Sequence, residues 1–557
     1  MRRRHALLLA ALIALALVTW LRIHLIDTLP DQGYFAKYLA FTDRILAGRI
    51  PRDRLADLSP GYLWFVVLLR SLGAGMMAIR TLQIVMVSIA AICCGLAARR
   101  FGTIAMIAAP VFLLASRAAL VCATEAEPET LILLLVSAGL AALSYSHSAS
   151  GALFGLAAAC RPVVMLGAAA IAIVERSWKL IVAAIVPLVL LLIVNIALTG
   201  EVVLMDPGTV FYEGMNPSAT GYEGVQPRIV NDIERTSIEP DYLHVAYRIV
   251  ASRSAGRPLT RAESNRFWTG KALAFVRAYP RAALMLTLHK VFFAIHSHDA
   301  YDLATMARKD ALLGRYPFLP FGAVLALAGA GVLLARERRR ELLPFLVFAL
   351  AGFAVLVAFY VTARQRNAIL PALAVLAAVG VSEVIARRHL IAAVAVIIVA
   401  ILLGINGPAQ IEDTNGWLGV RNAFDDALTL EQQGRWADAD RLLAQLEADD
   451  YHPIRENRAV PSVAFYRARA ALHLGHDPRP LLDRATSEAP GNEHVLAMRA
   501  RLGDGEAGKL LFALHDAMTA RRALSGGGEW ELAVAGLASK SSTTPSPTPP
   551  PHIPPLP

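Results

Sequence analysis

Long apolar stretches, many of them near the length that crosses a bilayer, constrain this chain more than any other feature of its sequence. The first covers about residues 6–20, and the others lie near residues 77–97, 103–116, 129–146, 151–174, 180–198, 316–335, 342–361, 368–386 and 390–406. Arg161 and Pro162 interrupt one of these stretches, and proline cannot continue a helical ladder, so we divide it into two helices. The pattern predicts an all-α polytopic membrane protein with roughly eleven transmembrane helices.

The composition supports this fold class and excludes others. Hydrophobic residues make up 56% of the 557 residues and charged residues 18%, whereas about 25% is usual in soluble domains. The net charge of +10 comes from basic clusters between the apolar stretches, which argues against nucleic-acid binding. The four cysteines lie in or beside apolar segments without zinc or redox spacing, and this indicates small buried side chains.

The basic clusters orient the expected spans through the positive-inside rule. Clusters near residues 2–4, 99–100, 176–179, 336–340 and 387–388 fall on one side, which we take as the cytoplasm together with an uncleaved N-terminal anchor. Loops 24–76, 117–128 and 199–315 then lie on the outer face, together with everything after residue 406. The expected location is the inner membrane, with the C-terminal domain outside the cytoplasm.

The first outer loop places an aspartate before an amphipathic helix. Tyr34, Tyr38, Phe41 and Ile45 recur at helical spacing and predict a helix in the membrane interface, and a second short apolar helix is expected from Ser59-Pro60-Gly61-Tyr62. Asp31 stands where an N-cap contributes about 1 kcal/mol. On spacing alone, capping is favoured over catalysis for Asp31.

Charged residues also gather in the later outer loops. Glu127 and Glu129 lie at the mouth of a span, where carboxylates are costly unless solvated, paired or functional. Lys290 lies within an apolar stretch, where a lone ammonium requires an anionic partner. Arg364 and Arg366 oppose the positive-inside bias, which indicates either a lipid phosphate or a headgroup anchor.

Two histidines in the 199–315 loop suggest a metal site at first sight. His296 and His298 are two residues apart, so on a helix they do not share a face. A solvated interfacial cluster is the preferred interpretation, and no metal site is assigned.

Four short motifs, taken in order, resemble a family of membrane transferases. They are Asp31-Gln32-Gly33-Tyr34, Ser59-Pro60-Gly61-Tyr62, Gly155-Leu156-Ala157 leading to Arg161-Pro162, and Arg364 to Pro371. Together they resemble the GT-C glycosyltransferases that use polyprenyl-phosphate sugars, akin to protein O-mannosyltransferases and lipid A aminoarabinose transferase. The resemblance covers about residues 1–406.

The resemblance implies an inverting transferase with its site at the outer face. Asp31 matches the family's general base, and Gln32 follows it where many relatives have glutamate. Glu127 or Glu129 matches the second acidic position, and Arg364 or Arg366 matches the late arginine. The further candidates are Arg161 and Lys290 for the donor phosphate, and Tyr34, Tyr62 and His298 for the acceptor or sugar pocket.

These residue types suit the implied reaction. A carboxylate takes the proton of the acceptor hydroxyl as it attacks the anomeric carbon, and Arg or Lys stabilises the charge that grows on the leaving phosphate. The expected partners are a polyprenyl-phosphate-linked sugar, membrane lipids and a glycan, lipid or protein acceptor. No cofactor is assigned, and a divalent metal stays open because some members of the wider superfamily use one.

The sequence after residue 406 predicts soluble helices. Residues 407–505 resemble a short tetratricopeptide array with glycines at the turns, which offers a surface for a protein partner. Residues 506–538 are expected to form a helical or linker segment, and the Ser/Thr/Pro-rich residues 539–557 a disordered tail.

Two other functions stay open at this point. A lipid or glycan transporter or flippase usually carries ionisable residues and broken helices at mid-membrane, in two related halves. Here the charges gather at one face and no half-to-half repeat is visible. A membrane scaffold that uses only its helical repeats would leave Asp31 and Arg364 without a role.

Overall fold

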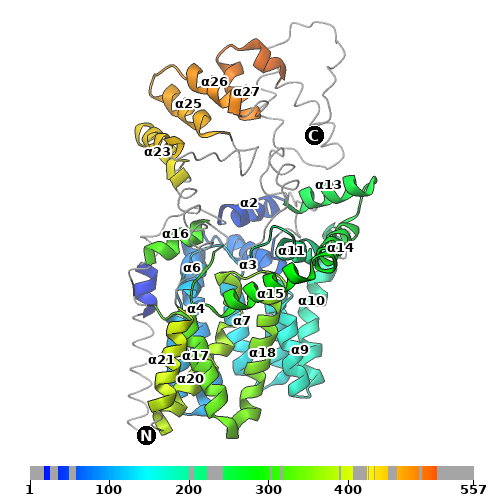
Figure 1. Cartoon of the computed structure of the whole chain (residues 1–557), viewed down its shortest axis with the longest axis vertical. Helices are drawn as coiled ribbons and strands as arrows, with labels where there is room; N and C mark the ends of the chain where they lie inside the picture. The colour runs from blue at the N-terminus through cyan, green and yellow to red at the C-terminus, as the bar shows by residue number, and fades with distance from the viewer. Residues whose placement is uncertain are drawn as a thin grey trace. The chain divides into compact units, whose positions relative to one another are not determined.

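The structure, a computed structural model, is all-α throughout the residues it describes (Figure 1). These are residues 18–24, 35–48, 58–199, 206–221, 243–301, 304–313, 316, 318–387, 390–404, 423–424, 426–428, 430–431, 433–448, 461–488 and 492–510. The chain divides into two compact units, Met1–Pro227 with His244–Asn422 and Arg228–Leu243 with Ala423–Pro557. Each unit is described by itself.

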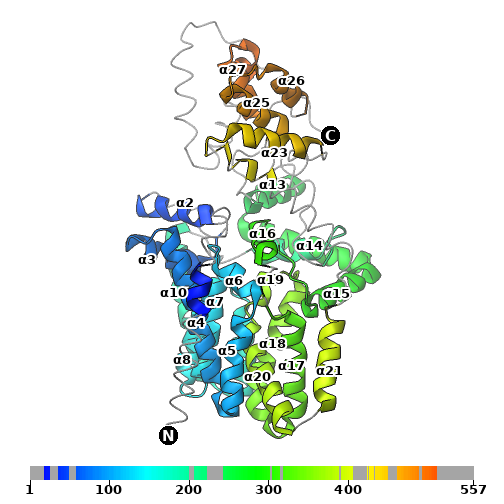
Figure 2. The same ribbon diagram turned by 90° about the vertical axis from the view of Figure 1, so that its left-hand side faces the viewer.

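A bundle of apolar helices forms the body of the first unit (Figures 1 and 2). Its helices are α4 (Met76–Ala98), α5 (Thr103–Leu114), α7 (Glu129–Ala142), α8 (His147–Cys160), α9 (Val164–Val174), α10 (Trp178–Thr199), α17 (Phe321–Leu334), α18 (Arg339–Ala358), α20 (Leu370–Arg387) and α21 (Leu390–Leu402). The outward faces remain apolar, as in α10, where Leu190 is 59% exposed. Apolar side chains both inside and outside a bundle indicate association with a membrane.

The lengths of these helices correct the expected number of spans. Within the described residues, Met76–Phe101, Trp178–Leu198 and Arg336–Ala358 are long and apolar enough to cross a membrane. A fourth span results if α5 and α6 (Arg117–Ala123), bent by 56° at their junction, are taken together. The expectation of roughly eleven spans is not met, because the other apolar helices have 10–17 residues and a crossing needs about 20.

The division of the 151–174 stretch is confirmed. Helix α8 ends at Cys160 and α9 begins at Val164, so that Arg161 and Pro162 lie at the break. Proline lacks the backbone N–H that would continue the ladder of α8.

Glycines allow two helix pairs of the bundle to pack backbone against backbone. A Cβ added to Gly151 of α8 would lie 2.1 Å from the carbonyl oxygen of Leu180 in α10. The same test at Gly331 of α17 gives 2.2 Å to the carbonyl oxygen of Leu376 in α20. Apolar surface alone does not drive helices together in a lipid environment, so such small-residue contacts fix which helices pair.

Further helices gather at one end of the bundle (Figures 1 and 2). Besides α6 they are α2 (Phe35–Leu46), α3 (Pro60–Ser71), α11 (Pro207–Gly214), α13 (Leu243–Ala255), α14 (Arg261–Ala278), α15 (Pro280–Ile295), α16 (Ala304–Leu313) and α19 (Ala363–Arg366). The helix expected from the spacing of Tyr38, Phe41 and Ile45 is confirmed as α2, and Tyr38 and Phe41 are buried. The second short helix is confirmed as α3.

The second unit contains α23 (Trp436–Ala448), α25 (Val463–His473), α26 (Arg479–Glu488) and α27 (Glu493–Arg501). Each of these helices packs against the next one along the chain. Gly434 and Gly475 adopt φ values of 74° and 76° before α23 and after α25, and this confirms that glycines occupy the turns. Residues 511–557 lie outside the described part of the chain, and with them the expected tail.

Candidate functional site

A loop with alternating carboxylates lies between α6 and α7, at the end of the bundle where the further helices gather. We call residues 124–129 the acidic loop. Glu125, Glu127 and Glu129 are buried, with 0%, 3% and 2% of their surfaces exposed. Glu129 opens α7, where the helix dipole favours a negative charge. Buried carboxylates are costly unless they are paired, and these three are.

Each carboxylate of the acidic loop pairs with a base from a different segment. The Nζ of Lys309 in α16 lies 2.6 Å from Oε1 of Glu125. The guanidinium of Arg364 in α19 lies 3.3 Å from Oε2 of Glu127. Arg161, at the break between α8 and α9, pairs with Glu129. The loop therefore joins three distant segments at one end of the bundle.

A side chain of α4, Gln83, makes hydrogen bonds to the backbone at the start of the acidic loop. The side-chain amide of Gln83 donates to the carbonyl oxygens of Ala123 and Glu125 at 2.8 Å and 2.7 Å. Tyr62, which is fully buried, donates its hydroxyl proton to Gln83. Tyr62 was a candidate for the sugar pocket. Within the described residues its hydroxyl orients the side chain of Gln83, so Tyr62 supports the acidic loop through Gln83.

Arg364 and Arg366 have different environments, although both were candidates for the phosphate. Arg366 is 3% exposed and donates to the carbonyl oxygens of His296 and His298 and, at 3.1 Å, to Asp299. Its guanidinium also lies over the ring of Phe321, 4.6 Å from the centroid. The side chain of Arg364 is 14% exposed and its described carboxylate partner is Glu127. Arg366 therefore fixes the 296–299 segment, and Arg364 is the arginine closer to solvent.

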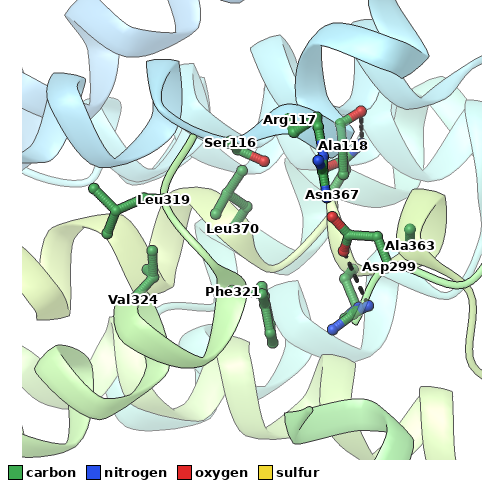
Figure 3. Close-up of a pocket in the computed structure, with 11 residues that line it drawn as sticks. Ser116, Arg117, Ala118, Asp299, Leu319, Phe321, Val324, Ala363, Asn367 and Leu370 are labelled. Atoms are coloured by element: carbon green, nitrogen blue, oxygen red, sulfur yellow. Dashed lines mark hydrogen bonds and ion pairs between the residues drawn. The ribbon is translucent and has the colours of Figure 1, made fainter. Parts of the chain in front are cut away.

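A small cavity adjoins Arg366 (Figure 3). It measures about 20 Å³, which is room for a water molecule. Arg117, Asp299 and Asn367 line one side, and Leu319 and Val324 the other (Figure 3). This cavity is too small for a sugar.

An aspartate that pairs with Arg117 has a raised pKa. Asp310 of α16 lies 2.8 Å from Nε of Arg117 and accepts a hydrogen bond from the hydroxyl of Tyr301 at 2.9 Å. Burial, together with the charge of Asp299, raises the pKa of Asp310 to about 6, against the opposing effect of Arg117. The carboxyl group of Asp310 therefore changes charge near physiological pH.

The ion pairs described for the acidic loop include none of the remaining candidates. His298 is half-buried, its backbone N–H donates to Nδ1 of His296, and burial lowers its pKa. Lys290 is fully buried in α15. Asp31 and Tyr34 lie outside the described residues. In the part of the chain that the structure describes, no three His, Cys, Asp or Glu residues gather as metal ligands.

Two of the residues that build the site escaped the sequence analysis. Lys309 and Asp310 belong to the run Arg308-Lys309-Asp310, which is typical of a solvated surface. The amphipathic signal of α16 is weak, so nothing local indicated that Lys309 would be fully buried.

No protein-family model matches this chain, and neither a curated protein nor a solved structure matches it. The interpretation of the site therefore depends on its own geometry. That geometry brings buried carboxylates and cations together at one end of an apolar bundle, where the cations can hold an anionic group.

Proposed function

We propose that this chain is a membrane glycosyltransferase that moves a sugar from a polyprenyl-phosphate donor to a hydroxyl of an acceptor. The observation that carries the proposal is the pairing of Glu127 with Arg364. Their side chains are 4% and 14% exposed and come together from positions 237 residues apart. The reaction needs a cation that binds the lipid phosphate at the surface of an apolar bundle, and a carboxylate that holds this cation in position.

Each group has one role in the proposed reaction. The acceptor hydroxyl loses its proton to the carboxylate of Asp31 while its oxygen attacks the anomeric carbon. The bond from that carbon to the phosphate oxygen breaks, so the sugar is transferred with inversion and the polyprenyl phosphate leaves. Arg364 stabilises the negative charge on the departing phosphate, and Glu127 holds Arg364 in place.

The other ion pairs support this centre. Glu129 with Arg161 ties the start of α7 to the break after α8, and Glu125 with Lys309 ties the acidic loop to α16. In this proposal the bundle is set in the inner membrane with the acidic loop at its outer face. Such a placement leaves the donor's isoprenoid chain in the lipid and its phosphate at the level of Arg364.

The test is a transfer assay with the purified full chain, a fluorescent polyprenyl-phosphate sugar and cell-envelope fractions as acceptors. We expect label to move to an acceptor with wild type and to be strongly reduced with Arg364→Gln. Arg257→Gln, which removes an exposed guanidinium paired with Glu263, is the matched control and should transfer normally. Flipping of the labelled lipid across vesicles without transfer would contradict the proposal and support a transporter.

A further inference from the structure

The end of the bundle away from the acidic loop contains four connections between helices (Figures 1 and 2). Gln83, near the start of α4, contacts the acidic loop, and α4 runs for 23 residues to Ala98, a length of about 34 Å. The connection after α4 therefore lies far from that loop. We give the name basic end to the connections 99–102, 143–146, 175–177 and 335–338, together with the first turn of each helix that follows them.

Two arginines join two of these connections. Arg338 donates to the carbonyl oxygen of Arg100, and Arg100 donates to the carbonyl oxygen of Glu341 at 2.7 Å. Both guanidinium groups also lie over the ring of Phe101, at 5.1 Å and 5.0 Å from its centroid. The connections after α4 and α17 are thus held together by arginines whose guanidinium groups contact the protein itself.

The other two connections are linked to this pair through side chains. The guanidinium of Arg99 lies over the ring of Tyr145, 4.6 Å from its centroid. The Nε2 of His147 lies 3.8 Å from Oε2 of Glu175. Four segments that are distant in sequence therefore form one contiguous group at this end of the bundle.

Most cations of the basic end have no carboxylate partner among the described residues. Those that are exposed and lack such a partner are Arg99, Arg176, Lys179, Arg336, Arg339 and Arg340. The opposite end differs, because Lys309, Arg161 and Arg364 each pair with a glutamate. Exposed charges of one sign repel one another, so the basic end favours anions supplied from outside the chain.

Exposed aromatic and aliphatic side chains at the basic end indicate where those anions are held. Trp178 is 68% exposed and Tyr145 is 62% exposed, and these two residue types are enriched where a membrane meets water. Ile173 and Leu333, one turn before the connections that contain Arg176 and Arg336, are 77% and 62% exposed. An acidic protein or a nucleic acid would leave such apolar side chains in water, whereas a bilayer covers them and presents phosphates at the level of the arginines.

We infer that the basic end binds the headgroups of anionic phospholipids, of which phosphatidylglycerol is the simplest example. Guanidinium groups bind lipid phosphates through charge-assisted hydrogen bonds. Each basic residue beside an anionic membrane surface strengthens the attraction about five-fold. The inference needs a bilayer but not the transfer reaction, and the basic end contains none of the residues that the proposed function uses. It therefore stands or falls independently of that function.

The experiment places the full chain in nanodiscs of phosphatidylcholine that contain either brominated phosphatidylglycerol or brominated phosphatidylcholine. Bromine atoms quench tryptophan fluorescence at short range, and Trp178 reports on the basic end. Because the chain has 7 tryptophans, the quenching measured with Trp178→Phe is subtracted from that of wild type. We expect Trp178 to be quenched at a much lower mole fraction of the anionic lipid than of the neutral one.

A triple variant tests whether the exposed cations cause this preference. It replaces three exposed arginines of the basic end by glutamine, Arg176→Gln, Arg339→Gln and Arg340→Gln. Removing three charges should weaken the binding of phosphatidylglycerol about 100-fold, at about five-fold for each charge. The matched control makes the same change of net charge at exposed positions of α14 and α15, Lys271→Gln, Arg277→Gln and Arg281→Gln. It should bind as wild type does.

Three results would overturn the inference. They are equal quenching of Trp178 by the two lipids, an unchanged preference in the triple variant, and an equal loss in the control variant, which would show that net charge alone matters. Salt provides a second measurement on wild type that needs no variant at the cations. Because salt screens exposed charges, the preference for the anionic lipid should fall as sodium chloride rises from about 0.1 M to about 1 M. A preference that salt leaves unchanged would likewise contradict binding by exposed arginines.

Discussion

Glu125 and Lys309, 184 residues apart in the chain, form an ion pair in which neither side chain is exposed and Oε1 lies 2.6 Å from Nζ. The Nζ also donates to the carbonyl oxygen of Thr124. The pair connects the acidic loop to α16, so it joins two segments that are distant in sequence at the charged end of the bundle. Its removal is the sharpest available test of whether that end is a single cooperative structure.

We expect Lys309→Met to lower the free energy of unfolding by about 3–5 kcal/mol, because it leaves Glu125 buried and uncompensated. Adding Glu125→Gln should recover much of that loss, since the double variant has no stranded charge. Chemical denaturation of wild type, Lys309→Met and the double variant measures both effects. Lys290→Met is the matched control, and a similar loss there would show that any buried lysine is equally important.

Arg364 and Arg366 should separate function from folding. Arg366→Gln is expected to cost about 2–4 kcal/mol, because it removes donors from the carbonyl oxygens of His296 and His298. Arg364→Gln should cost less, because the glutamine amide can still donate a hydrogen bond to Glu127, and it should chiefly raise the KM for the donor. Denaturation and donor titration measure the two effects, and the opposite ranking would exchange the roles of the two arginines.

Asp31 remains a prediction from the resemblance, because it lies outside the described residues. Asparagine caps a helix nearly as well as aspartate but is a very poor base. Asp31→Asn should therefore keep its thermal stability while its turnover falls by about 10²–10⁴-fold. Asp43→Asn, at an exposed carboxylate paired with Arg70, is the control. A fully active Asp31→Asn would move the base to Glu127 or Glu129.

The raised pKa of Asp310 predicts that the free energy of unfolding depends on pH. Its pKa is about 6 in the folded chain against an ordinary value of 3.8, so the folded state binds the proton more tightly. The free energy of unfolding of wild type should therefore rise relative to Asp310→Asn as the pH falls from 6 to 3.8, by up to about 3 kcal/mol. Urea denaturation across that range measures it. A difference that is constant with pH would mean that Asp310 has an ordinary pKa.

The sequence predicted those parts of the structure that depend on local chemistry. Pro162 stops α8, and the stripe of Tyr38 and Phe41 defines the buried face of α2. The number of spans was wrong because apolar runs do not show where helices end, as in α17, which has only 14 residues.

The site was predicted in part, for a related reason. Charged residues in or beside apolar stretches drew attention to Glu127, Glu129, Arg161 and Arg364, which the structure joins in two ion pairs. Lys309 could not be found in this way, because its burial depends on a contact with a residue 184 positions away. Pairing between such distant segments leaves no local signal in a single sequence.

The glycine contact between α17 and α20 has a consequence for variants far from any charge. Arg366 stacks on Phe321, the first residue of α17, and precedes the start of α20 by four residues. Gly331 joins the same two helices further along their length. Helices α17 and α20 are thus held together at two points along their length. A larger side chain at Gly331 would push the two helices apart and would change the position of Phe321 relative to the guanidinium of Arg366. A substitution in the apolar interior can in this way disable the charged end without touching it.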